Sequence, residues 1–255
     1  MRDLILINCR EEELTRERAG FCSALGRRAD ILVAPVARLA APAITLAGGA
    51  SIPASDVSSL WHLDPPTTRI PEGLPSSDVL TVWVHMDGGT AIPWRSLWSE
   101  LFDVACVCGT EASGFNGAGS YRLLAQPYAA RREWFSANSN TRNLEIAWAG
   151  STDGTIYSRR RRLLPHLAAR YRMNDWKEKI PEASVVPLYR RAKIVVNIQR
   201  DDCPDLYSLR CFEAFAAGAL LLTGAPSLLE NAGFRDGTHY AGYRSDAELF
   251  FKGNR

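Results

Sequence analysis

The segments KIVVNI (193–198) and SLRCFEAFAAGALLLT (208–223) decide the fold class of this chain. The first segment is apolar and rich in β-branched residues, which is typical of a buried parallel strand. The second predicts a helix over 209–217, a stop at Gly218 and another buried strand over 219–223. Because strands that alternate with helices form mostly parallel sheets, the two segments together indicate an α/β fold.

Arg210 and Glu213 are the candidate ligand-binding residues of this helix, three positions apart. Ligands of open α/β sheets collect where strands hand over to helices, and a guanidinium near a carboxylate suits a charged ligand that carries hydroxyl groups. The spacing alone also fits a solvated ion pair on a helix surface, worth roughly 0.2–0.5 kcal/mol. Asn197, at the end of the preceding strand, is predicted either to cap a turn or to touch the ligand.

Strands and helices are expected to alternate along most of the chain. The other expected strands span 4–7, 31–36, 79–84, 104–107 and 144–149. The other expected helices end at Gly26, span 94–101 and 157–171, or begin near Ser184 and Ser245. The stretch 42–78 is rich in Pro, Ser, Gly and Ala and is predicted to consist mainly of loops with short elements.

A polar and basic stretch near 130–143 indicates a boundary between two domains. The predicted domains are 1–140 and 141–255, each with its own sheet. The chain has 255 residues, of which 46% are hydrophobic, and this is enough for two modest cores.

The composition argues against several classes of protein. A net charge of +2 with 23% charged residues predicts neither a disordered tail nor a bulk nucleic-acid binder. The six cysteines lack CxxC spacing and no His/Cys cluster accompanies them, so core cysteines in a reducing compartment are expected, with no metal site. The start MRDLILINCREEE is too soon charged for a signal peptide, and no apolar run reaches membrane-spanning length. A cytoplasmic location without a membrane span is therefore expected.

Several motifs occur in a fixed order along the second half of the chain. They are EIAWAGS (145–151), LYRRAKIVVNI (188–198), R-x-F-E-A-x-A-x-G (210–218) and GFRDGTHYAGY (233–243), preceded by FDVACVCG (102–109) and LLAQPYAARREWF (123–135). The ordered set resembles the C-terminal domain of GT-B-fold glycosyltransferases, in particular the spore maturation protein CgeB-like group of group 1 transferases. The resemblance implies two Rossmann-like domains, with mostly parallel sheets, that face a central cleft.

The resemblance also implies where a nucleoside-diphosphate sugar would bind. The donor would lie on 141–255, with Glu213 on the nucleotide ribose and the acceptor on 1–140. Arginines would approach the pyrophosphate, because guanidinium forks fit phosphate oxygens. The donor-side residues expected on this basis are Gly150, Ser151, Arg160, Arg161, Asn197, Arg210, Glu213 and His239.

The expected reaction is metal-independent glycosyl transfer, with the nucleotide sugar as substrate and no further cofactor. His85 and Asp87 follow a predicted strand and are candidates for a catalytic base or polar anchor on the acceptor side. A simple turn at the end of that strand explains the same residues equally well. The pair Asp201-Asp202 is expected to be solvent-exposed rather than to bind a metal.

Two other classes of function remain open from the sequence. The chain could keep a nucleotide or sugar pocket without catalysis, or it could modify nucleic-acid bases through a basic rim. The rim would consist of arginines 131, 132, 159–162, 170, 172, 190 and 191. The acceptor is left open as a small molecule, glycan, protein or nucleic acid, and a homodimer is one way to cover so short a chain.

Overall fold

The structure is a computed structural model that describes most of the chain. The described residues are 3–14, 16–63, 70–74, 78–85, 97–108, 122–126, 129–135, 141–204, 207–224 and 227–252. The chain divides into two compact units, 1–126 and 127–255. Among the described helices, none has the length and apolarity needed to cross a membrane.

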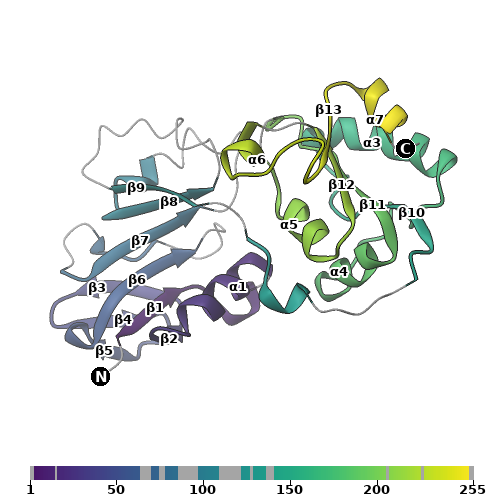
Figure 1. The fold of residues 1–255 in the computed structure, drawn as a ribbon. Helices are drawn as coiled ribbons and strands as arrows, with labels where there is room; N and C mark the ends of the chain where they lie inside the picture. The colour runs from purple at the N-terminus through teal and green to yellow at the C-terminus, as the bar shows by residue number, and fades with distance from the viewer. Residues whose placement is uncertain are drawn as a thin grey trace. The chain divides into compact units, whose positions relative to one another are not determined.

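The first unit is built on a six-stranded parallel sheet (Figure 1). In spatial order its strands are β2 (Asp30–Val33), β1 (Leu4–Asn8), β6 (Val57–Leu63), β7 (Leu80–His85), β8 (Val104–Cys108) and β9 (Arg122–Gln126). The chain leaves β1 for β2 on one side and later returns to β6 on the other. The order of the strands therefore reverses between β1 and β6, which is the kind of position where α/β folds bind ligands.

Different layers cover the two faces of this sheet. Helix α1 (Arg16–Leu25) packs its Phe21 and Leu25 against one face. A small antiparallel sheet of β3 (Val36–Ala40), β4 (Ala43–Leu46) and β5 (Ser51–Pro53) contributes to the core on the other face. Both faces of the sheet are thereby buried, which explains the apolar runs of its strands.

The sequence prediction was wrong at three places in this unit. The stretch 42–78 is not mainly loop, because it contains β6, a strand in the middle of the sheet. Strand β6 carries several polar residues in VSSLWHL, so it lacks the continuous apolar signal of its neighbours. The strand expected over 31–36 is two strands, which separate at Pro35, and β9 was not predicted at all.

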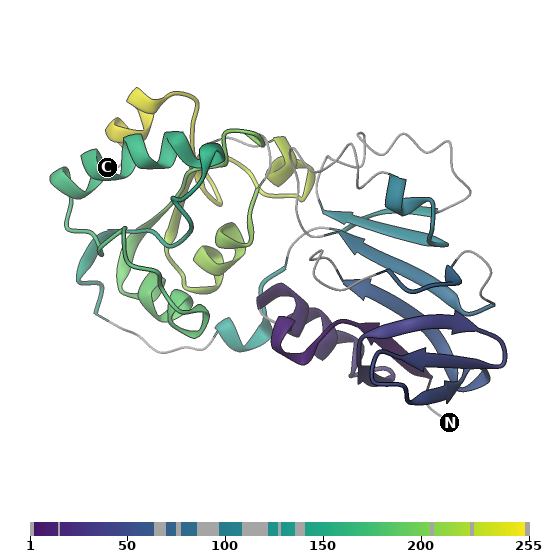
Figure 2. The ribbon, with the colours of Figure 1, turned by 180° about the vertical axis from the view of Figure 1, so that it is seen from behind.

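The second unit has a four-stranded parallel sheet in the sequential order β10-β11-β12-β13. Its strands are β10 (Leu144–Ala147), β11 (Ala192–Asn197), β12 (Leu220–Gly224) and β13 (Ala241–Tyr243). Helices α3 (Ser158–Arg170) and α7 (Asp246–Lys252) contribute to the core on one face, and α4 (Glu182–Arg190) and α5 (Leu209–Ala216) to the core on the other (Figure 2). The predicted α/β class with mostly parallel sheets is confirmed.

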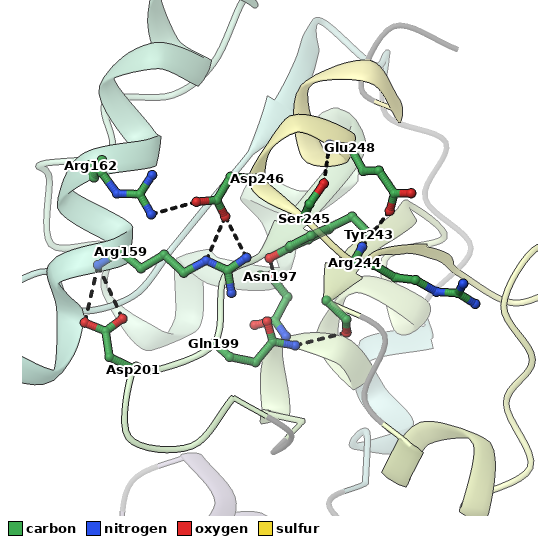
Figure 3. Close-up of polar contacts among 11 residues, drawn as sticks. Arg159, Arg162, Asn197, Gln199, Asp201, Tyr243, Arg244, Ser245, Asp246 and Glu248 are labelled. Carbon is green, nitrogen blue, oxygen red and sulfur yellow. Dashed lines mark hydrogen bonds and ion pairs between the residues drawn. The ribbon is translucent and has the colours of Figure 1, made fainter.

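Two helix ends show how local sequence fixes this unit. Helix α5 ends in a Schellman motif, in which Ala219 N–H donates to Ala214 O and Gly218 N–H to Phe215 O. Gly218 has a φ of 67°, as this motif requires. The capping predicted at Ser245 is confirmed, since its hydroxyl accepts a hydrogen bond from Glu248 N–H at 3.2 Å (Figure 3).

Helices α4 and α3 each contain a proline beyond their first turn. Helix α4 begins at Glu182, after Pro181, so the predicted start near Ser184 was wrong. Pro187 lies beyond its first turn, on the exposed side of the helix. Pro165 lies within α3, which continues through it from Ser158 to Arg170.

The unit division also falls earlier in the chain than the boundary expected after residue 140. The short 3-10 helix Arg132–Phe135 belongs to the second unit, because Trp134 packs against the core that α4 and α5 share. Arg190 of α4 donates a hydrogen bond of 2.8 Å to Trp134 O. The polar composition of this segment resembles a linker, but its contacts are those of a packed element.

Candidate functional site

The candidate site lies at the carboxyl edge of the sheet in the second unit. The strands of this sheet follow one another in sequential order, so no reversal of strand order marks a site. The side chains at the strand ends mark it instead. Residues 148–151 follow β10, residues 198–199 follow β11, and Gly224 ends β12.

Arg210 of α5 ties the loop after β10 to the end of β11. Its Nε and Nη2 donate to Ala149 O at 2.9 and 2.5 Å, and its Nη1 donates to Asn197 Oδ1 at 2.6 Å. The side chain is buried, with 7% of its surface exposed. Arg210 is therefore first a positioning residue, which fixes two loops of the candidate site relative to each other.

Gly150 makes this contact possible. A Cβ at residue 150 would overlap Nη2 of Arg210 and would lie 3.1 Å from Cζ2 of Trp148. Any side chain at this position would therefore displace the guanidinium or the indole ring. The sequence predicted a close approach of backbone to ligand at Gly150, and the structure gives this glycine a role in packing against Arg210.

Arg160 of α3 joins the same two loops from the other face of the sheet. Its Nη1 donates to Ser151 O and its Nε to Ile198 O, both at 2.9 Å. Burial, followed by the positive charge of Arg210, lowers the pKa of Arg160 to about 9. The guanidinium is still charged at neutral pH, and the shift reflects burial first and the neighbouring positive charge of Arg210 second.

The indole of Trp148 lies close to both of these cations. The guanidinium carbons of Arg210 and Arg160 are 5.5 and 6.0 Å from its ring centroid. Such contacts stabilise a buried cation without neutralising its charge. Trp148 was not singled out from the sequence, where it falls inside the strand expected over 144–149, whereas the observed strand β10 ends at Ala147.

The four arginines of 159–162 have separate roles. Arg159 and Arg162 both donate to the carboxylate of Asp246 at the start of α7, at 2.7–2.9 and 2.6 Å (Figure 3). Arg161 is exposed and donates to Thr152 O and Gly154 O, both at 2.6 Å. Every arginine of the run therefore has a partner inside the protein.

The pair Asp201-Asp202 is structural. Asp201 caps α3, because its carboxylate accepts hydrogen bonds from Ser158 N–H at 2.8 Å and from Arg159 N–H at 3.3 Å. These backbone N–H groups at the N-terminus of α3 therefore already have an anionic partner within the protein. Asp202 is not solvent-exposed as predicted, since it forms a two-pronged ion pair with Arg200 at 2.7–2.9 Å.

Asn197 is at the centre of a buried hydrogen-bond network on the α5 face. Its Oδ1 accepts from Arg210, and its Nδ2 donates to Thr223 Oγ1 at 3.0 Å. Glu213 lies one turn after Arg210 on α5 and is 1% exposed. The interpretation of Arg210 and Glu213 as a solvated surface pair is therefore wrong, because both side chains are buried.

The remaining predicted residues are not part of this cluster. His239 is exposed in a turn of its own, where its Nδ1 accepts a hydrogen bond from Arg235 N–H at 2.9 Å. In the first unit, His85 ends β7, is buried and stacks on Trp83 with the ring centroids 5.3 Å apart. Asp87 lies outside the described residues.

The first unit contains a polar pair that joins Asn8, which the sequence analysis missed, to His62. Asn8 ends β1 and lies in register with His62, the second-last residue of β6, at the reversal between these strands, and Asn8 Nδ2 lies 2.9 Å from His62 Nδ1. Asn8 was hidden because a single Asn after an apolar run is a common strand end. Within the described ranges, no group of three His, Cys, Asp or Glu residues could hold a metal ion.

Comparison with known proteins supports a class for the second unit. Residues 131–254 match the model of a family described as glycosyl transferase-like. The match covers the whole described sheet of the second unit and its candidate site, and it supports assignment to the glycosyltransferases. A comparison with curated protein sequences found no match.

Proposed function

We propose that this chain is a glycosyltransferase that binds a nucleoside-diphosphate sugar at the carboxyl edge of β10–β12. The family match of residues 131–254 supports the general reaction class. Within that class, the order of the sequence motifs favours the spore maturation protein CgeB-like group. The sugar passes to an acceptor whose chemistry is left open, and a homodimer remains part of the proposal.

The observation that carries this proposal is the pair of buried guanidinium groups, Arg160 and Arg210. Both donate to backbone carbonyl oxygens or to an amide oxygen, which satisfy N–H groups without cancelling a full charge. A guanidinium has five N–H donors, and these contacts use two in Arg160 and three in Arg210. The remaining donors suit the oxygens of a diphosphate.

The proposal gives roles to the other predicted donor-side residues as well. Glu213 accepts hydrogen bonds from the ribose hydroxyls, for which a carboxylate is well suited. Gly150 and Ser151 let the backbone approach the diphosphate, and Arg161 supports their loop from outside. His239 borders the donor only if its turn closes toward the site.

The proposed chemistry uses charge rather than a metal. As the bond from the sugar to the diphosphate breaks, Arg160 and Arg210 stabilise the developing negative charge on the leaving group. On the acceptor side, His85 or Asp87 would take the proton from the attacking hydroxyl in an inverting reaction. His85 has no exposed surface in the described structure, so Asp87 is the first residue to test.

The two other classes of function differ in how well the contacts support them. A nucleotide-binding module without turnover uses the same pocket, so only kinetics separates it from an enzyme. A basic rim for nucleic acid is less well supported, because arginines 159, 161, 162 and 190 are engaged within the protein.

Thermal unfolding with UDP, GDP, CDP, dTDP and their hexose conjugates tests the proposal. One diphosphate is expected to raise the melting temperature of the wild-type protein and of the surface control Glu178→Gln, but much less that of Glu213→Gln. If no diphosphate raises it, the donor site is wrong. Release of free diphosphate from the sugar nucleotide, with and without EDTA, then separates turnover from binding and tests metal independence.

A further inference from the structure

Gln199 is a buried polar residue at the candidate site that the proposed function does not yet use. It follows β11 by two residues, and 4% of its surface is exposed. Its Nε2 donates to Thr223 Oγ1 at 3.0 Å and to Gly224 O at 3.1 Å. Its Oε1 is buried and has no hydrogen-bond partner among the residues that the structure describes.

The contacts of Nε2 fix the orientation of this side-chain amide. Gly224 O can only accept a hydrogen bond, so a rotated amide would place Oε1 against another oxygen. The Thr223 hydroxyl is also committed, because it accepts from Asn197 Nδ2 at 3.0 Å and donates to Gly224 O at 3.1 Å. Oε1 is thus held in place as an acceptor that its own neighbours cannot satisfy.

The same hydrogen-bond network connects the side chain of Gln199 with Arg210. Arg210 donates to Asn197, Asn197 donates to Thr223, and Gln199 donates to the same hydroxyl. The positive charge of Arg210 polarises the first of these bonds. The amide of Gln199 is thus joined to the proposed diphosphate site through the Thr223 hydroxyl, while its Oε1 takes part in none of these bonds.

Gly224 leaves room for this amide. A Cβ at residue 224 would lie 2.8 Å from Oε1 of Gln199. Any other residue here would cover the acceptor with carbon, or would push the amide away. Buried acceptors are nearly always paired, so a buried acceptor that lacks a partner among the described residues, at a strand end of the candidate site, points to a ligand or a bound water.

We infer that Oε1 of Gln199 determines specificity for the nucleotide sugar by accepting a hydrogen bond from an O–H or N–H group of that ligand. This inference rests on the proposed function, since it assigns a residue to the same site. Three groups of such a ligand could donate this hydrogen bond: a sugar hydroxyl, a ribose hydroxyl or an N–H group of the base. All three are neutral hydrogen-bond donors.

Binding measurements with matched ligands and two variants test the inference. Gln199→Met removes the acceptor at nearly constant length, whereas Gln199→Glu keeps an acceptor oxygen and, like Gln199→Met, loses the two hydrogen bonds that Nε2 donates. The probes are UDP, GDP, CDP, dTDP, UDP-glucose and GDP-mannose, measured calorimetrically on the full chain. Analogues of the tightest probe then lack one donor each: monodeoxy sugars, the 2′- and 3′-deoxyribose forms and an N-methylated base.

One analogue is expected to bind the wild-type protein about tenfold more weakly than its parent, which is the usual worth of one buried hydrogen bond. Gln199→Met should bind that analogue and its parent equally well, and Gln199→Glu should still prefer the parent. If a monodeoxy sugar analogue loses affinity, the sugar supplies the hydrogen-bond donor to Oε1. If a deoxyribose analogue or the methylated base loses affinity, the nucleoside supplies it.

The outcomes separate this inference from the proposed function. If the wild-type protein binds none of the six probes, the proposed function fails and the inference fails with it. If a probe binds but Gln199→Met discriminates among the analogues as the wild-type protein does, only the inference is overturned, and a water satisfies Oε1. Because the analogue series is also measured on the wild-type protein, instability of one variant does not obscure the result.

Discussion

The carboxyl edges of the two parallel sheets carry different kinds of polar group. In the first unit, an amide and two imidazoles lie at or next to the strand ends, at Asn8, His62 and His85. In the second unit, two guanidinium groups reach the strand ends from helices, at Arg160 and Arg210. The same α/β architecture thus presents amide and imidazole groups at one edge and two guanidinium groups at the other.

The difference also concerns what each polar group holds together. Asn8 joins a neighbouring strand through His62 and the start of β3 through Val36 N–H, at 2.9 Å each. Arg160 and Arg210 instead join loops, because each reaches both the segment after β10 and the end of β11. In the second unit, the residues that shape the loops are thus the residues proposed to bind the anion.

The largest effect is expected when Arg210 is replaced. Arg210→Met leaves Ala149 O without the guanidinium donors and leaves Asn197 Oδ1 with only the weaker donor Ser208 Oγ, at 3.2 Å, so the free energy of unfolding of the second unit should fall by about 3 kcal/mol. Urea unfolding gives the total loss, and hydrogen exchange of the β10 and β11 amides assigns it to this unit. Arg210→Lys keeps the positive charge but not the planar guanidinium with its several N–H donors. It should therefore recover only part of the lost free energy of unfolding.

Asn8→Ala is the matched change in the first unit. It removes the contacts to His62 and to Val36 N–H, and a loss of about 1–2 kcal/mol is expected, seen in the β1 and β6 amides. If Asn8→Ala costs more than Arg210→Met, the contrast between the two edges is wrong. If both variants expose the same amides, the two units do not unfold as separate bodies.

An effect smaller than that of Arg210→Met is expected from a single methyl group at residue 150. Gly150→Ala places a Cβ against Nη2 of Arg210 and the ring of Trp148, and overpacking of this kind costs about 1–3 kcal/mol. It should also weaken the thermal response to the diphosphate that stabilises the wild-type protein. Gly48→Ala in the first unit is the control, because its Cβ meets no atom within 4 Å and should change stability by less than about 0.5 kcal/mol. Equal effects of the two substitutions would show that Arg210 can move freely.

Much of the fold could be predicted because its signal is local. The strands β7, β8, β10, β11 and β12 and the helix α5 each follow from a short apolar pattern, and the Gly218 stop follows from one residue. Strand β6 could not be predicted in this way, because its Ser58 and Ser59 interrupt the apolar run. Its place between β1 and β7 depends on partners far away in the sequence.

The candidate site was predictable in composition but not in geometry. Sequence reasoning selected Gly150, Asn197 and Arg210, and the structure brings these three together. It could not foresee that arginines would bind backbone carbonyls, because a carbonyl carries no sequence signature. It also could not foresee that Asp201 caps a helix that begins 43 residues earlier in the chain. Contacts of this range depend on the assembled fold.

The smallest expected effect concerns the acid sensitivity of the second unit. Burial acts to raise the pKa of Asp246, but hydrogen bonds from Arg159 and Arg162 outweigh it and lower that pKa. A carboxylate with a lowered folded-state pKa adds stability above its unfolded value of about 3.9, and this stability is lost as the pH falls through the lower folded value. Asp246→Asn should therefore be less stable than the wild-type protein at pH 7, by less than about 1 kcal/mol because the pair is partly exposed. The difference should shrink below pH 4, and also at 1 M salt.

Urea unfolding of both proteins at pH 7, 5 and 3.5 measures this difference in the free energy of unfolding. Hydrogen exchange of the amides in α3 and in β1 shows which of the two units carries it. An unchanged difference at every pH, or one located in β1, would contradict the assignment of this ion pair to the second unit's acid response.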